Sequence, residues 1–148
     1  MERTFVMIKP DGVGRGLAGD VISRYEKRGL KLVALKMQHL TAAQAERHYG
    51  EHKGKSFYNE LVSFITSGPS IQIVLEGKDA VAQVRKMHGA TNCLDALPGT
   101  IRGDFGLSNQ KNLVHASDSP ETAAREIALY FEEDEIISYE LPIAEWLR

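Results

Sequence analysis

The sequence has 148 residues, of which 43% are hydrophobic and 26% charged, so it suits one domain, residues 1–148, with a full-sized core. Its 18 basic and 20 acidic side chains give a net charge of −2, which excludes attraction of nucleic acid by overall charge. The single cysteine, Cys93, excludes an internal disulfide and favours a reducing compartment. Met1 leads directly into a strand-like segment and no apolar run could span a bilayer, so we expect a cytoplasmic protein with no membrane partner.

The N-terminal part predicts a strand, a turn, a helix and a second strand. Residues 4–8 are β-branched and apolar, as in a buried strand, and residues 9–12 have the Pro-Asp-Gly composition of a turn. Residues 18–29 place apolar side chains at helical spacing and end on a glycine. Residues 30–40 alternate apolar and polar side chains, which predicts a strand. The apolar residues of this alternation are Val33, Leu35 and Met37.

The middle of the chain predicts three helices and a third strand, followed by an irregular segment. Thr41 is typical of a helix start, and its short helix reaches about Tyr49. A second helix ends at Gly68-Pro69, a strand covers residues 70–75, and a third helix carries residues 81–88. The apolar stripe of the second helix is Phe57, Leu61, Phe64 and Ile65.

Residues 89–111 show no sustained periodicity and contain Pro98 and several glycines. An irregular segment of this length in a compact domain is usually either functional or disordered. Ile101 and Phe105 would anchor it to a core, so we expect an ordered functional loop.

The C-terminal part predicts a short strand, a long helix and a tail. The strand covers residues 113–115 and ends on a histidine, and Ser119-Pro120 has the residue types of a helix start. The tail, residues 132–148, is first acidic and then apolar. The stripe of the long helix is Ala124, Ile127, Ala128 and Phe131.

This order of elements predicts the fold class. Two strand–helix–strand units with extra helices are typical of an α+β, ferredoxin-like βαββαβ sandwich with a four-stranded antiparallel sheet. Two other patterns point elsewhere and are rejected. Gly14-x-Gly16-x-x-Gly19 imitates a dinucleotide fingerprint, but it does not begin at the strand end, and no carboxylate follows the second strand. The P-loop pattern is absent from the sequence.

The histidines do not predict a zinc site. His48 and His52 have the i,i+4 spacing of ligands on one helix face, but no third ligand is evident, so we interpret them as a surface pair. His115 is different, because it lies at a strand end just before the predicted helix start at Ser119. A histidine there could meet an anionic group that the helix amides favour. From these residues alone, a structural histidine remains the alternative.

Basic and polar residues scattered along the chain would suit a phosphate site. Each one taken singly is more typical of a solvated surface, but together they offer the charge and donors that a di- or triphosphate needs. Tyr49 and Phe57 could add an aromatic face for a base, although a phenylalanine in a helix stripe is more often core. The phosphate candidates are Lys9, Arg85, Thr91, Arg102 and Asn112.

Separated blocks of the sequence closely resemble nucleoside diphosphate kinases over essentially the whole chain. The block from His115 to Ser119 resembles the active-site motif of that family, and the block from Pro98 to Phe105 matches independently of it. The other matching blocks are residues 2–5, 8–12, 48–49, 66–69, 75–77 and 89–92.

The resemblance implies ping-pong transfer of a γ-phosphoryl group from a nucleoside triphosphate to a nucleoside diphosphate through a phosphohistidine. His115 matches the nucleophile, Glu126 the carboxylate that orients it, and Ser117 a hydroxyl beside it. Phe57 matches the residue that stacks on the base, and Leu61 a smaller contact nearby. The residues that match contacts to phosphates and ribose are Lys9, Tyr49, Arg85, Thr91, Arg102 and Asn112.

The resemblance also implies a cofactor and an assembly. Mg²⁺ would bridge the nucleotide phosphates, with Asp118 near it through water. The C-terminal tail and Pro98 resemble hexameric members, with a tetramer as the alternative. Nucleic acid is not required. A non-catalytic ferredoxin-like module that binds nucleic acid or regulates is the rival interpretation, but its exposed aromatic strands and basic face are not predicted here.

Three residues depart from the expected pattern. Cys93 stands where the family usually has proline, which bears on the stability of the long loop. Asn109 stands where many members place a small apolar residue beside the base. Glu126 lies off the predicted stripe of its helix, so periodicity alone predicts that it is exposed.

Overall fold

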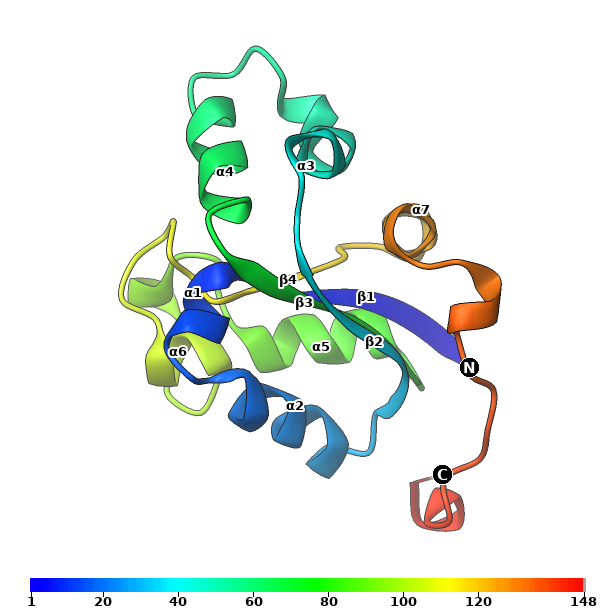
Figure 1. The fold of residues 1–148 in the computed structure, drawn as a ribbon. Helices are drawn as coiled ribbons and strands as arrows, with labels where there is room; N and C mark the ends of the chain where they lie inside the picture. Colours follow the sequence, from blue (N-terminus) through cyan, green and yellow to red (C-terminus); the bar gives the residue numbers. More distant parts are fainter. Residues whose placement is uncertain (148) are drawn as a thin grey trace.

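The computed structural model describes residues 1–147 and confirms the predicted α+β, ferredoxin-like fold. Its four-stranded antiparallel sheet has the order β2-β3-β1-β4, so the first strand lies inside the sheet and the second lies at an edge (Figure 1). Within residues 1–147, no helix combines the length and the apolar character that a membrane crossing requires. The strands are β1 (Glu2–Ile8), β2 (Lys31–His39), β3 (Pro69–Gly77) and β4 (Val114–Ala116).

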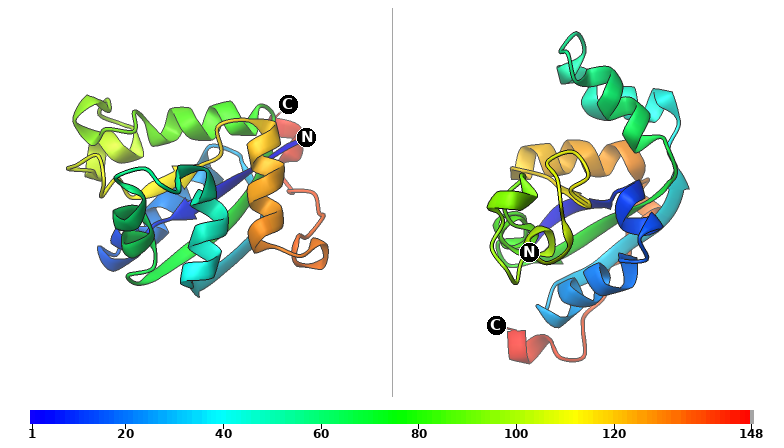
Figure 2. Two further views of the ribbon diagram at one scale, coloured as in Figure 1. Left: turned by 90° about the horizontal axis from the view of Figure 1, so that it is seen from above. Right: turned by 90° about the vertical axis from the view of Figure 1, so that its left-hand side faces the viewer.

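Helices cover both faces of the sheet, as Figures 1 and 2 show. α2 and α5 pack on one face, and α3, α4 and α7 form the layer over the other. The α-helices are α1 (Pro10–Gly14), α2 (Ala18–Lys27), α3 (Ala42–Tyr49), α4 (Tyr58–Ile65), α5 (Ala80–His88), α6 (Ile101–Phe105) and α7 (Pro120–Tyr130). Short 3₁₀ helices are η1 (Gly50–His52), η2 (Cys93–Asp95), η3 (Glu133–Glu135) and η4 (Ala144–Leu147).

The apolar run of β1 has a simple cause. Successive side chains of a strand point to opposite faces, and both faces of this sheet are covered. Phe5 and Met7 therefore enter the core under α3 and α7, while Val6 and Ile8 enter the core under α2 and α5. The central strand needs apolar residues on both sides, which is why its sequence is continuous rather than alternating.

The alternation in residues 30–40 predicted the strand correctly, but most of its apolar side chains are not buried. Val33 is buried, whereas Leu35 and Met37 are 46% and 59% exposed. A β-bulge between Leu32 and Ala34 shifts the register against β3. The edge strand therefore presents two apolar side chains to its surroundings.

Two local predictions were wrong. Residues 9–12 do not form a simple turn, because Pro10 begins the short helix α1, where its missing N–H costs nothing. In α7 the expected stripe is displaced, since Ala124 and Ala128 are exposed and Phe131 follows the helix as its C-cap. The face of α7 that is buried carries Ala123, Glu126 and Tyr130. Alanines define a helix face poorly because they are short enough to fit on either side.

The start of α7 agrees with its sequence. Ser119 is the N-cap, and its hydroxyl accepts a hydrogen bond from the backbone N–H of Thr122 at 3.1 Å. Pro120 is the first helical residue. The cap fixes where the helix begins, and therefore which of its residues face the sheet.

The long segment, residues 89–111, is ordered, as its hydrophobic anchors predicted. Ile101 is fully buried in the core under α2 and α5, and Phe105 packs against that core. The Cys93 side chain is buried over Gly106, whose position leaves no room for a Cβ because that atom would lie 2.1 Å from the sulfur. The cysteine thus fills space that the glycine leaves free.

A buried polar pair links α2 to α5. The Tyr25 hydroxyl and His88 Nε2 are 2.5 Å apart, and both residues are almost completely buried. Burial, followed by the nearby Arg102 charge, holds the pKa of His88 well below its ordinary value. His88 therefore stays neutral in the folded protein, although it can protonate when the chain unfolds.

This pair predicts a pH-dependent stability. His88 has a lower pKa in the folded than in the unfolded protein, so its contribution to the free energy of unfolding is fully present above about pH 6.5. As the pH falls, the unfolded chain takes up a proton that the folded protein does not, and the free energy of unfolding decreases by about 1.4 kcal/mol at pH 5.5. The double variant Tyr25→Phe/His88→Leu should lose that part of the pH dependence. Urea unfolding at pH 7.5 and 5.5 measures it. An unchanged pH dependence in the double variant would contradict the prediction.

Candidate active site

One cavity of about 420 Å³ collects most of the residues predicted for the site. Its wall is built by the start of α1, the ends of α3 and α5, the long segment, β4 and α7. Phe57, Leu61 and Ser117 are the predicted residues that lie outside this wall. The predicted residues in the wall are Lys9, Tyr49, Arg85, Thr91, Arg102, Asn112, His115, Asp118 and Glu126.

His115 lies in the middle of β4, opposite Met7 of β1. Its side chain is 23% exposed, so one edge of the ring remains accessible from the cavity. Its Nε2 lies 3.0 Å and 3.1 Å from the two carboxylate oxygens of Glu126. The sheet thus holds the histidine, and a helix from the next layer supplies its partner.

Glu126 is almost completely buried, at 2% exposure, contrary to the prediction from periodicity. Its carboxylate accepts hydrogen bonds from His115, from Ser117 Oγ at 2.6 Å and from His48 Nε2 at 3.0 Å. Burial by itself raises the pKa of this carboxyl, but the hydrogen bonds that it accepts from His115 and His48 hold its pKa well below the ordinary value. Glu126 is therefore ionised and fully satisfied.

The ionised carboxylate determines the tautomer of His115. A carboxylate only accepts hydrogen bonds, so Nε2 must carry the ring proton. Nδ1 then holds a lone pair, and no hydrogen bond from residues 1–147 engages it. Burial lowers the pKa of His115, and Glu126 opposes that effect only in part. The ring is therefore neutral at pH 7, with Nδ1 available as a nucleophile.

The cations of the site are tied to the long segment. Lys9, the N-cap residue of α1, donates from Nζ to Asn112 Oδ1 at 2.8 Å. The Asn112 amide in turn donates to the Thr91 carbonyl at 3.1 Å. Burial, and after it the Arg102 charge, lowers the pKa of Lys9 to about 8. These contacts place an ammonium group at the cavity with its own charge poorly compensated.

Two arginines fix the backbone around the cavity. Arg102 is buried and donates to the carbonyls of Asn112, Gly89 and Val114 at 3.1, 3.0 and 2.6 Å. Arg85 is exposed and donates to the Ala116 carbonyl at 3.3 Å. Both guanidinium groups therefore bring positive charge to the cavity wall, where an anionic ligand would be favoured.

The peptide bonds before His115 are held in an unusual conformation. Leu113 has a φ of 75°, although it is not a glycine. Its N–H donates to Asp11 Oδ2 at 3.1 Å, and its carbonyl accepts from the Lys9 N–H at 2.8 Å. The turn places Asn112 beside Lys9 and leaves Val114 in β4. The strained residue Leu113 therefore lies between the residue that binds the Lys9 ammonium and the strand that carries His115.

The aromatic candidates occupy different places. Tyr49 is buried and stacks on His48, with ring centroids 4.4 Å apart, while its hydroxyl is buried without a hydrogen-bond partner in residues 1–147. Phe57, the N-cap residue of α4, is 47% exposed. Leu61, one turn into α4, packs partly buried against the core of that layer. The structure therefore brings Tyr49 into the site, whereas the half-exposed Phe57 ring has the His52 ring beside it, with centroids 5.4 Å apart, and Lys55 Nζ 5.8 Å from its centroid.

His48 was predicted to lie on the surface, and that prediction was wrong. It is 3% exposed, and its two ring nitrogens contact Glu126 and Tyr130. Within residues 1–147, the only cluster of three potential metal ligands close enough to share an ion consists of His48, His115 and Glu126. Their hydrogen bonds already account for these ligand-type atoms. The His48-Tyr49 block was the one sequence signal that could have placed His48 in the site.

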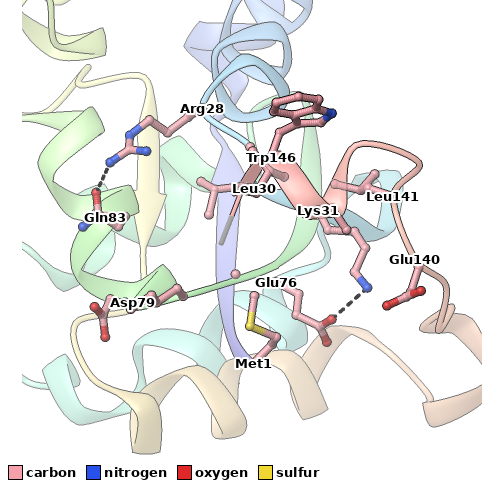
Figure 3. Close-up of a pocket in the computed structure, with 15 residues that line it drawn as sticks. Met1, Arg28, Leu30, Lys31, Glu76, Asp79, Gln83, Glu140, Leu141 and Trp146 are labelled. Carbon is pink, nitrogen blue, oxygen red and sulfur yellow. Dashed lines mark hydrogen bonds and ion pairs between the residues drawn. The ribbon is translucent and has the colours of Figure 1, made fainter.

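A larger cavity, of about 720 Å³, lies between the C-terminal tail and the adjoining ends of β2 and β3 (Figure 3). Some of its charged side chains are paired with neighbours, as Lys31 is with Glu76 and Arg28 with Gln83. It holds none of the residues predicted for catalysis. Size alone therefore does not identify the site.

Comparisons with known proteins agree with this geometry. The family model described as nucleoside diphosphate kinase matches residues 2–136. The nucleoside diphosphate kinase of Carboxydothermus hydrogenoformans is 58% identical over 147 residues, 99% of both chains. That of Methanosarcina mazei is 60% identical over 139 residues, 94% of this chain and 93% of the relative.

A solved structure extends the similarity to three dimensions. The halophilic nucleoside diphosphate kinase from Halobacterium salinarum, in complex with CDP, has a TM-score of 0.97 at 50% identity and covers 99% of this chain and 98% of its own. The fold, the family model and the relatives all agree over nearly the full chain. The chain belongs to the nucleoside diphosphate kinase family and is a phosphotransferase.

Proposed function

We propose that residues 1–148 act as one domain that transfers the γ-phosphoryl group of nucleoside triphosphates to nucleoside diphosphates through a phosphohistidine on His115. The observation that carries this proposal is the bond from His115 Nε2 to the buried Glu126 carboxylate. That bond leaves Nδ1 as the nucleophilic nitrogen.

Both half-reactions take place at Nδ1 of His115. Nδ1 of His115 attacks the γ-phosphorus, the bond from phosphorus to the β-phosphate oxygen breaks, and the nucleoside diphosphate leaves with the electron pair. A second diphosphate then attacks the phosphohistidine with its terminal oxygen and regenerates the free imidazole. Glu126 and Ser117 hold Nε2–H in place and balance the positive charge of the phosphorylated ring.

The cations would bind and neutralise the phosphates. Lys9, Arg85 and Arg102 line the cavity with positive charge, and phosphoryl transfer depends mainly on positioning and charge neutralisation. Thr91 and Asn112 supply polar groups, and the unpartnered Tyr49 hydroxyl suits a phosphate or ribose oxygen. These contacts carry no base information, so all common nucleobases would be accepted.

The base would stack on Phe57. Its exposed ring at the start of α4 needs no hydrogen-bond code to hold a nucleobase, and Leu61 would add a small apolar contact. The Halobacterium structure holds CDP, which supports a nucleotide ligand for this fold. Asn109 is exposed, where it could meet the base edge.

Mg²⁺ fits the site as an ion carried by the nucleotide. The cavity wall offers Asp118 as an exposed carboxylate, whereas Glu126 is already satisfied. Oxygen ligands suit Mg²⁺, which retains water and binds phosphates. When bound, the ion would neutralise phosphate charge, with Asp118 holding one of its waters.

We further propose a cytoplasmic homo-hexamer, with a tetramer as the alternative. Leu35 and Met37 leave an apolar face on the edge strand β2, and Leu97 in the long segment is 73% exposed. Exposed apolar surface of this kind is typical of protein interfaces. The rival nucleic-acid module finds little support, because the cations gather in a cavity with a nucleophile rather than along the sheet.

The phosphohistidine makes the first prediction about activity. Labelled ATP should leave acid-labile, base-stable phosphate on His115, and GDP should remove it as GTP. His115→Ala should lose at least about 1,000-fold in kcat/KM. His39→Ala is the matched control, because His39 lies exposed at the end of β2. Full activity in His115→Ala would overturn the proposal.

The pKa of Lys9 predicts how nucleotide affinity depends on pH. The ammonium of the free enzyme loses its proton near pH 8, so the Kd for ADP should rise as the pH increases above 8, by at most about tenfold per pH unit. Lys9→Met should bind more weakly at every pH and show a flat profile. Calorimetric titration between pH 7 and 9 tests this. Parallel profiles for the two proteins would contradict it.

The edge strand predicts the assembly. Light scattering of the wild-type protein should give the mass of a hexamer, and Leu35→Lys/Met37→Lys should give a smaller species. Ala128→Lys is the control, since Ala128 is exposed on α7. An unchanged mass for the double variant would show that β2 takes no part in the interface.

A further inference from the structure

The hydrogen bonds behind His115 continue past Glu126. His48 Nε2 lies 3.0 Å from Glu126 Oε2, and His48 Nδ1 lies 2.6 Å from the Tyr130 hydroxyl. Tyr130 belongs to α7, as Glu126 does, and His48 belongs to α3, which lies beside α7 over the same face of the sheet (Figure 2). His48, Glu126 and Tyr130 are all at least 95% buried.

When His48 is neutral, the donors and acceptors leave one consistent arrangement for this series of hydrogen bonds. Glu126 is ionised and only accepts, so His48 must present an N–H from Nε2. A neutral His48 then has a lone pair on Nδ1, and the Tyr130 hydroxyl must donate to it. Burial, with the nearby Tyr49 and Glu126, raises the pKa of Tyr130, so the hydroxyl keeps its proton.

The opposite tautomer of His48 would break this series of hydrogen bonds at the buried Glu126 carboxylate, where the loss costs most. The Nε2 lone pair would then face a buried carboxylate, and Glu126 would keep only His115 and Ser117 as donors. Leaving a buried charge short of a donor is more expensive than losing a hydrogen bond in water. The Tyr130 hydroxyl favours the productive tautomer because it offers its proton to Nδ1.

The packing prevents the two rings from turning away. The Tyr130 ring stacks on Phe5 with centroids 5.0 Å apart and an interplanar angle of 7°. The His48 ring stacks on Tyr49 at 4.4 Å and meets the His115 ring edge-on at 4.8 Å. The ring positions are therefore set by the core, and the protons are set by the hydrogen bonds.

We propose that His48 and Tyr130 are positioning residues for phosphoryl transfer, in which the Tyr130 hydroxyl donates to Nδ1 of His48 and holds that ring in place, and His48 holds the Glu126 carboxylate against Nε2–H of His115. Neither residue touches the nucleotide in this assignment. The inference rests on the proposed role of His115 as nucleophile. The consequence is that the Tyr130 hydroxyl, which is two hydrogen bonds away from Glu126, influences the reactivity of His115 Nδ1.

The test compares Tyr130→Phe with wild type in single-turnover phosphorylation by ATP. Losing one neutral hydrogen bond should slow phosphorylation by about three- to tenfold and leave the Kd for nucleotide unchanged. Tyr58→Phe is the matched control, because Tyr58 is buried in the same layer and its hydroxyl has no hydrogen-bond partner in residues 1–147. It should phosphorylate at the wild-type rate.

A spectroscopic measurement separates positioning from a general loss of structure. Nitrogen NMR of ¹⁵N-histidine protein should show His48 and His115 as Nε2–H tautomers in wild type and Tyr58→Phe. In Tyr130→Phe, Nε2 of His48 should keep its proton, and the ¹⁵N signal of His48 Nδ1 should move toward that of an unbonded lone pair. A coupling test adds His48→Gln, which keeps an N–H donor for Glu126 but lacks the Nδ1 to which Tyr130 donates, so that adding Tyr130→Phe should cause no further slowing.

The outcomes distinguish the two proposals. If wild-type His115 takes no phosphate, the proposed function itself fails. If wild type is phosphorylated and Tyr130→Phe matches it in rate and in the ¹⁵N signal of His48 Nδ1, the positioning role of Tyr130 is overturned. A slowing by Tyr130→Phe that persists in the His48→Gln background would also overturn it, because the effect would not pass through His48.

Discussion

The site depends on one buried negative charge. An ionised carboxylate inside a protein is costly unless donors surround it, and Glu126 meets this condition with His115, His48 and Ser117. These donors come from β4, from α3 and from the link between β4 and α7. The carboxylate can therefore remain ionised while it is buried only when the sheet, α3 and α7 are in place, so the reactive state of His115 is a property of the complete fold.

The cationic half of the site is organised differently. Lys9 follows the central strand, and Arg102, in the long segment, donates its hydrogen bonds to the backbone carbonyls of Gly89, Asn112 and Val114. Folding of this segment thus brings positive charges together before any phosphate binds. The hydrogen bonds to the backbone offset the repulsion between these charges. One half of the cavity stabilises a histidine and the other attracts polyanions, and the strained turn at Leu113 joins the two.

The sequence was informative where one physical requirement dominates. The apolar run of β1, the serine cap of α7 and the anchors Ile101 and Phe105 each reflect a single demand, and each prediction was confirmed. Patterns failed where tertiary contacts decide. The alanines of α7 could not indicate its buried face, because that face carries Glu126 and Tyr130, whose polar ends have partners far away in the chain.

The candidate site shows the same limit. The types of Lys9, Arg85 and Arg102 suggested a phosphate site, but only the resemblance to a family assembled them around His115, and the structure brings them to one cavity. His48 escaped the periodicity argument because helical spacing to His52 says nothing of a carboxylate on another helix. Hydrogen-bond partners distant in sequence are invisible to any local pattern.

The contact between Cys93 and Gly106 bears on how this chain can change over time. A Cβ at position 106 would lie 2.1 Å from the Cys93 sulfur, 2.8 Å from the Cys93 Cβ and 2.9 Å from the Arg102 carbonyl oxygen. A smaller residue at position 93 therefore does not by itself make room for a side chain at position 106, because the Arg102 backbone still blocks it. Position 106 has to remain glycine for as long as that backbone keeps its shape, so the arginine of the cavity wall depends on a neighbour that has no side chain.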